Sequence, residues 1–170
     1  MTRTHYTQLR AEIDRKRPRQ PPASSAAEQA LLGALLISNR AYQEVADIVR
    51  PDDFAWPAHQ RIFAAMGKLI GVGQEANPIS LSHLFGSDAA FPDAGPAKYL
   101  AELAVSAVTL LNSIDYALII ADLSLRRSLI AELEDPQPGE TLVDILNACK
   151  PRIKALAEAA ARLREGVDAR

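Results

Sequence analysis

Apolar residues recur along most of the chain with the three- and four-residue spacing of amphipathic helices. Between residues 25 and 110, Ser25, Pro51, Pro57 and Gly71 mark starts or ends of these stretches. Proline suits the first turn of a helix, whereas the residue before a proline avoids helical geometry. The pattern therefore predicts a compact helical body. Its expected helices cover about residues 25–37, 40–50, 57–70, 80–85 and 96–107.

Polar side chains near these helices have predicted structural roles. Ser25 and Glu28 fit a capping box, in which the serine oxygen accepts a free N–H and the glutamate reaches back. Asn39 is the predicted N-cap of the second helix. His59 shares a face with apolar residues, so we expect a hydrogen-bonded core histidine. Trp56 is interpreted as a packing anchor rather than a platform for bases.

The last two predicted helices form an αα-hairpin. A helix over residues 112–133 is apolar on more than one side, which indicates that several neighbours cover it. The segment 135–139 is rich in proline and predicts a turn, after which Thr141 and Asp144 cap a final helix. We therefore predict an all-α fold with four parts: a basic flexible arm (1–24), a small orthogonal helical bundle (25–110), an αα-hairpin (111–165) and a tail (166–170).

The final helix carries an apolar seam in alternating steps of four and three residues. This heptad spacing is typical of a helix that packs lengthwise on another helix. Pro151 interrupts the seam and should kink the helix or divide it in two. The partner is either the protein's own body or another copy of the chain. We favour another copy, because the seam continues so far from the body. The predicted docking residues are Leu142, Leu146, Cys149, Ile153, Leu156 and Leu163 of this helix, with Leu118 and Leu125 of the preceding one.

Composition agrees with a helical protein. Apolar residues make up 48% of the 170 residues and aromatic residues only 5%, so helix formers outweigh strand formers. There is no apolar run long enough for a membrane span and no signal-peptide pattern, so we expect a cytoplasmic protein without membrane contact. A single cysteine excludes an internal disulfide framework.

Charge is unevenly distributed along the chain. Residues 1–25 hold six basic and two acidic side chains, a net charge of +4, while the whole chain has −2. A basic arm on an acidic body can contact nucleic acid or an acidic partner, but we favour a solvated, disordered leader. The candidate nucleic-acid contacts are Arg15, Lys16, Arg17 and Arg19.

The sequence lacks the patterns that catalysis would require. It contains no GxxxxGK[ST] loop, and its histidines and cysteine have no metal-ligand spacing. Asp52 and Asp53 are interpreted as capping a turn, and Arg126 and Arg127 as solvated or salt-bridged rather than phosphate-binding. We therefore predict no catalytic residue, no metal and no cofactor.

Five parts of the chain carry a recognisable order of residues: Ala27–Leu36, Val45–Phe54 running into Pro57–Met66, Pro78–Leu81, Tyr99–Leu103 and Asn112–Ile120, the last followed by Arg126-Arg127. Single segments are weak signals, but their order and spacing together are specific. Over about residues 26–130 they resemble the N-terminal domain of DnaB-type replicative helicases. That family usually has aspartate where this chain has Ser80.

The resemblance implies a small helical bundle and a hairpin that pairs between subunits. In the family, paired domains form a collar of three dimers above the motor ring, and the collar is the docking surface for primase. We therefore expect a non-catalytic oligomerisation and docking module. Its partners would be itself, as a dimer or a trimer of dimers, and primase or the replicative helicase.

This chain departs from the family pattern at three points. The family continues through a linker helix into an ATP-binding motor, which these 170 residues lack, so we expect neither nucleotide hydrolysis nor unwinding. The early turn after residue 134 shortens the first hairpin arm, and Pro151 interrupts the second. Two alternatives stay open: an accessory or decoy protein that binds a host helicase or primase, and a helical protein that binds nucleic acid through its basic arm.

Overall fold

The computed structural model describes residues 21–86, 90–92, 95–106, 112–135, 137 and 139–168. Helices account for the regular structure of these residues, and no strand occurs among them, so the predicted all-α class is confirmed. The elements in chain order are α2 (Ser25–Ile37), α3 (Asn39–Val45), the 3₁₀ turn η1 (Pro51–Asp53), α4 (Pro57–Gly71), α5 (Pro78–Phe85), α6 (Gly95–Ser106), α7 (Ser113–Glu134) and α8 (Leu142–Asp168).

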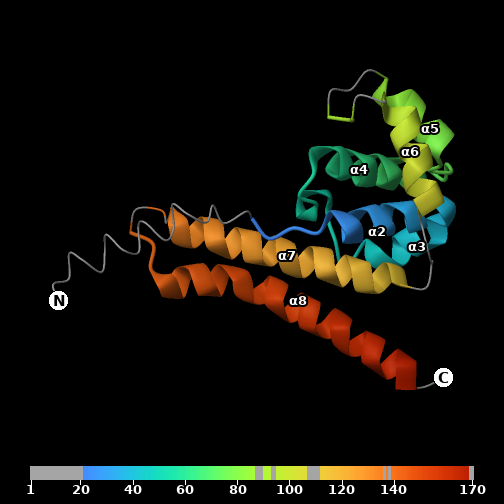
Figure 1. The fold of residues 1–170 in the computed structure, drawn as a ribbon. Helices are drawn as coiled ribbons and strands as arrows, with labels where there is room; N and C mark the ends of the chain where they lie inside the picture. The colour runs from blue at the N-terminus through green and yellow to red at the C-terminus, as the bar shows by residue number, and fades with distance from the viewer. Residues whose placement is uncertain are drawn as a thin grey trace.

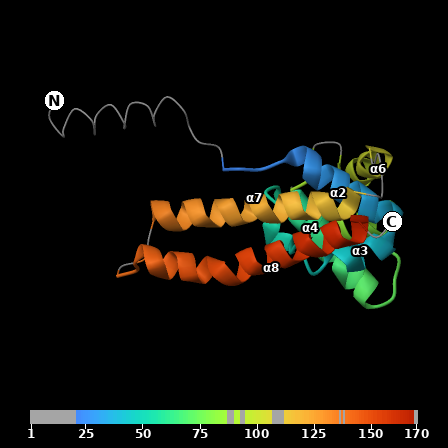
Figure 2. The ribbon, with the colours of Figure 1, turned by 90° about the horizontal axis from the view of Figure 1, so that it is seen from below.

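The helices form a bundle with a long hairpin attached. Elements α2 to α6 gather at one end of the molecule, and α7 and α8 run antiparallel beside each other (Figures 1 and 2). The turn between α7 and α8 lies at the end of the hairpin far from the bundle (Figure 1). The predicted order of bundle and hairpin is therefore confirmed.

The core extends from the bundle into the first half of α7. Helix α2 is the central element, because Leu31, Leu32 and Leu35 are fully buried. Ala117 and Ile120 of α7 belong to the same apolar cluster. The segments on either side of the predicted bundle–hairpin boundary near residue 110 therefore share one core. None of the described helices is both long and apolar enough to cross a membrane.

Two of the predicted caps are wrong. The side chain that caps α2 is Ser24, whose Oγ accepts the Ala27 N–H at 3.2 Å. Glu28 is buried and does not reach back to the helix start. Asn39 is the first residue of α3, and its side-chain amide donates to the carbonyls of Leu35 and Ala76 instead. In both cases a tertiary hydrogen bond satisfies the polar side chain better than the local cap does.

His59 lies in the core and is hydrogen-bonded, as predicted. Its Nδ1 lies 2.7 Å from Glu28 Oε2, and its Nε2 lies 2.6 Å from the Tyr99 hydroxyl. Glu28 Oε1 also accepts the Ala55 N–H at 2.7 Å. The matching assignment for a neutral His59 beside an ionised Glu28, which can only accept, places the proton on Nδ1 and lets Nε2 accept from Tyr99. This buried network joins α2, α4 and α6.

We expect Glu28→Gln to lower the free energy of unfolding by about 2 kcal/mol, because a buried donor is left without an acceptor. Glutamine offers one acceptor oxygen to the two donors, the Ala55 N–H and His59 Nδ1. Urea denaturation would measure the change, with the exposed Glu44→Gln as the matched control. Equal stabilities of the two variants would contradict the role assigned to this network.

Helix α8 continues through Pro151 as one element of 27 residues. Of the two effects predicted for Pro151, a kink or a division of the helix, the division therefore does not occur. The helix changes direction part-way along in both views (Figures 1 and 2), as expected where a proline removes one backbone hydrogen bond. It ends at Asp168.

Candidate docking surface

Helix α8 packs one face against α7 and the bundle. Ile145, Cys149 and Ala159 are buried, and Arg152 and Leu156 are partly buried. These residues are spaced four, three, four and three apart, so they form a heptad seam within the molecule. The predicted seam shares only Cys149 and Leu156 with it. The inward register therefore differs from the one that apolar residues alone indicated.

The other predicted seam residues face away from this contact. Leu142, Leu146 and Ile153 have exposed fractions of 58%, 46% and 45%. Further exposed apolar side chains lie beside the turn of the hairpin, at the end of α7 and the start of α8. We call the whole set the hairpin surface: Ile130, Leu133, Leu142, Val143, Leu146 and Ile153.

The remaining sequence-predicted residues fall into three groups. Cys149 is buried, so it supports α8 from within rather than offering a contact. Leu118 and Leu125 of α7 are partly buried, and Leu156 packs on the bundle core. Outside the described residues and side chains lie Leu163 and the basic residues Arg15, Lys16, Arg17 and Arg19.

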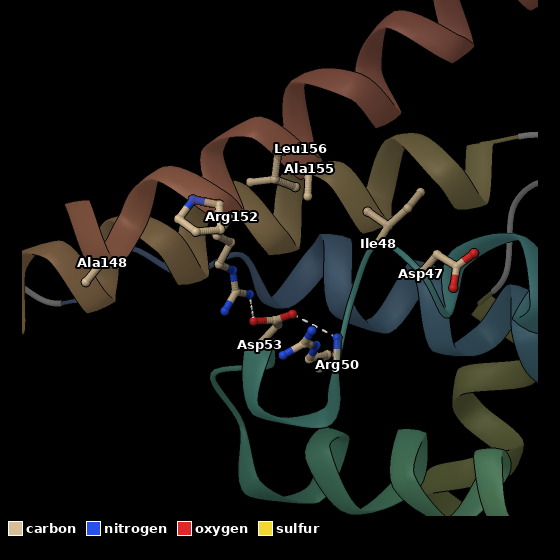
Figure 3. Close-up of a pocket in the computed structure, with 9 residues that line it drawn as sticks. Asp47, Ile48, Arg50, Asp53, Ala148, Arg152, Ala155 and Leu156 are labelled. Atoms are coloured by element: carbon tan, nitrogen blue, oxygen red, sulfur yellow. Dashed lines mark hydrogen bonds and ion pairs between the residues drawn. The ribbon is translucent and has the colours of Figure 1, made fainter. Parts of the chain in front are cut away.

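A buried ionic joint fixes α8 to the bundle at the level of η1. Asp53, with an exposed fraction of 1%, accepts the Arg50 N–H at 2.8 Å through Oδ2. Its Oδ1 accepts Ser124 Oγ of α7 at 2.8 Å and is ion-paired with Arg152 of α8. Figure 3 shows the Arg152 and Asp53 side chains meeting between α8 and η1. One carboxylate thus ties together three elements.

Only part of this joint was predicted from the sequence. Asp53 was predicted to cap a turn, which the bond from the Arg50 N–H confirms. The role of Arg152 was not predicted. An arginine spaced regularly among Ile145, Cys149 and Leu156 was the available signal, because a cation within an apolar seam needs a buried acid.

The two neighbouring arginines of α7 have different roles. Arg126 pairs with Asp122 at 2.8 Å on the exposed side of α7, as predicted. Arg127 donates to the Asp53 carbonyl and, at 2.9 Å, to the Pro22 carbonyl. It therefore holds the segment before α2 against η1 and α7, a role that its solvated or salt-bridged interpretation did not include.

The predicted cap at the start of α8 is confirmed. The Thr141 N–H and Oγ1 donate to Asp144 Oδ2, and Thr141 Oγ1 accepts the Asp144 N–H at 3.3 Å. These hydrogen bonds favour the ionised carboxylate, so they lower the pKa of Asp144 below its ordinary value of 3.8.

We expect the start of α8 to fray in acid. A carboxyl group whose pKa is lowered in the folded protein adds its full stability only above the ordinary pKa of that group. That stability is lost as the pH falls through the lowered pKa of Asp144. An NMR titration of the Asp144 side chain should give a midpoint below 3.8, and Thr141→Ala should return it toward that value. An unchanged midpoint in Thr141→Ala would refute the assigned cause.

The described residues of this region do not assemble a metal site. Within the described stretches, no group of three or more histidine, cysteine and acidic side chains could hold a metal ion. Asp53 has all its hydrogen bonds directed into the protein. The exposed apolar hairpin surface is therefore the strongest candidate functional site.

Known proteins are similar to this chain in sequence, and a solved structure is similar to it in fold. Replicative DNA helicase DnaB of Rickettsia typhi is 39% identical over 113 residues, which are 66% of this chain and 23% of that protein. The Pasteurella multocida counterpart is 31% identical over 152 residues, 86% of this chain and 32% of that protein. The chain thus spans about a quarter to a third of the length of these relatives.

A solved structure and a family description agree with these relatives. The crystal structure of the N-terminal domain of DnaB helicase from Mycobacterium tuberculosis matches with a TM-score of 0.63 and 32% identity, over 79% of this chain and 99% of that chain. The family described as DnaB-like helicase N terminal domain matches residues 20–122, more than half of the chain. The chain therefore belongs to the family of DnaB-like helicase N-terminal domains.

Proposed function

We propose that this chain is a non-catalytic oligomerisation and docking module of a DnaB-like replicative helicase system. Copies pair through the hairpin surface, and the paired hairpins present a collar to primase or another replisome protein. The observation that carries the proposal is the exposure of six apolar side chains along the hairpin surface, which projects from the bundle. Exposed apolar side chains gathered on one part of a protein are typical of a protein contact.

A second copy is the occupant that the hairpin surface suits best. Its apolar residues recur along α8 at positions 142, 146 and 153, so the surface is elongated rather than a pocket. Two copies related by a two-fold axis would each bury the same residues, which is how most homodimers close. A dimer interface of standard size buries about 1,200–2,000 Å² in total. Three such dimers would complete the collar.

The non-catalytic part of the proposal follows from the chemistry of the chain. No phosphate-binding GxxxxGK[ST] loop occurs in the 170 residues. The buried acids Glu28 and Asp53 are both bonded within the fold. We therefore assign docking rather than catalysis to this chain.

Partner capture in purified form tests the docking role. The chain is mixed separately with the primase and with the full-length replicative helicase of its own organism, and complexes are resolved by size-exclusion chromatography. Binding of primase supports a docking collar, and incorporation into the helicase alone supports an accessory or decoy subunit. If neither protein shifts while the chain stays folded, the docking role is wrong.

A further inference from the structure

A cavity of about 270 Å³ lies between α8 and the segment that joins α3 to η1. Pro151 and Leu156 of α8 form part of an apolar wall, with Ile48 opposite. Two arginines also line the cavity: Arg152 of α8, and Arg50, which is the residue before η1. Figure 3 shows both guanidinium groups beside the Asp53 carboxylate. The cavity thus combines a cationic end with an apolar wall.

The cationic end has more positive than negative charge. Asp53 supplies one carboxylate to two guanidinium groups, and both of its oxygens already accept hydrogen bonds. Asp47 also lines the cavity, but its carboxylate points away from the two arginines (Figure 3). Among the described residues, the Arg50 guanidinium forms no hydrogen bond or ion pair. One positive charge therefore stays without an acidic partner.

The two arginines also repel each other. Burial lowers the pKa of Arg152 below its ordinary value, and the neighbouring charge of Arg50 lowers it further. A bound anion beside the two guanidinium groups would offset this repulsion and supply acceptors for the free donors of Arg50.

We propose that this cavity binds a single carboxylate carried on a short branched apolar group. The carboxylate matches the one uncompensated positive charge, and the apolar group contacts Ile48, Pro151 and Leu156. A doubly charged phosphate fits less well, because Asp53 lies between the arginines. Two sources share the required chemistry: a free aliphatic acid, and the terminal residue of a peptide. Neither depends on pairing of the hairpins.

NMR titration of the unmodified full chain tests this proposal. The probes are 4-methylpentanoate for a free acid and N-acetyl-leucine for a peptide terminus, with the corresponding amides as neutral controls. With the two acids, we expect saturable shifts of the backbone N–H signals in residues 47–53 and 148–156. The neutral control compounds should bind at least about tenfold more weakly. The tighter of the two acids identifies the source.

Arg50→Gln separates binding that depends on the positive charge from nonspecific apolar binding in the cavity. Arg50 is exposed, so the substitution should leave the fold intact. We expect it to weaken binding of the acids about tenfold, because a charge-assisted hydrogen bond is lost. Arg126→Gln, an exposed arginine on α7, should leave binding unchanged. The proposal is overturned if the acids give no saturable shifts at millimolar concentrations, if the amides bind equally well, or if Arg50→Gln binds like the unmodified chain.

Discussion

Replacing Leu146 and Ile153 together by aspartate is expected to convert a self-associated chain into a monomer at micromolar concentrations. The two side chains are seven residues apart and therefore lie on the same face of α8. Both belong to the hairpin surface and neither is part of the bundle core. The substitution should therefore act on association rather than on folding.

The expected size of the effect follows from burying charge without a partner. In a two-fold dimer each substitution occurs twice, so four carboxylates would enter an apolar contact. Removing an unpaired charge from water costs several kcal/mol, and about 2.7 kcal/mol is already a hundredfold change in affinity. We therefore expect the dimer dissociation constant to rise at least about a hundredfold.

The matched control introduces two aspartates at exposed apolar positions outside the hairpin surface. Ile79 of α5 and Val105 of α6 are also exposed apolar residues, with exposed fractions of 72% and 87%. Ile79→Asp with Val105→Asp should leave the mass in light scattering unchanged. Circular dichroism shows whether both double variants are folded. Pairing through the hairpin surface is refuted if Leu146→Asp with Ile153→Asp associates as strongly as this control.

Asp53→Ala is expected to cause the largest loss of stability, about 4 kcal/mol in the free energy of unfolding. The substitution removes the shared acceptor of the Arg50 N–H, the Ser124 hydroxyl and the Arg152 guanidinium. Breaking the ion pair from its buried acidic side leaves the Arg50 N–H, the Ser124 hydroxyl and the partly buried Arg152 without their acceptor. Urea denaturation measures the loss.

The adjacent residue provides the control for this variant. Asp52 lies in the same 3₁₀ turn but is exposed, so Asp52→Ala should change stability by no more than about 0.5 kcal/mol. Hydrogen exchange should also be faster along α8 in Asp53→Ala, because Arg152 no longer anchors this helix to η1. Equal stability of the two variants would contradict the joint.

The hairpin was predictable from sequence because its signals are local. Thr141 and Asp144 are three residues apart, and their cap depends on neither the bundle nor a partner. The turn after residue 134 and the apolar periodicity of both arms are equally local. The resemblance to the family then gave the order of bundle and hairpin.

The register of α8 was not predictable in the same way. Apolar spacing alone favoured Leu142, Leu146 and Ile153 as one seam with Cys149 and Leu156. The inward face instead includes Arg152, whose partner Asp53 lies 99 residues earlier in the chain. A search for apolar spacing does not count an arginine as part of a seam. The acid that makes burial of this arginine favourable is distant in sequence, so no local pattern indicates it.

The capping box at Ser25 and Glu28 failed for a related reason. The helix starts one residue earlier than this capping box requires, with Ser24 as its N-cap, and the Glu28 carboxylate finds two donors in α4 and the segment before it. Buried donors without an acceptor cost more than a lost helix cap. Tertiary hydrogen bonds thus override local caps where an acidic side chain enters the core.

Sedimentation equilibrium of the unmodified chain tests the central claim, that exposed apolar residues of the hairpin are covered by another copy. Well above micromolar concentration, we predict a mass of at least twice the 18.4 kDa of one chain. A single species of 18.4 kDa at every concentration would show that Leu142, Leu146 and Ile153 remain in water, and would contradict the account.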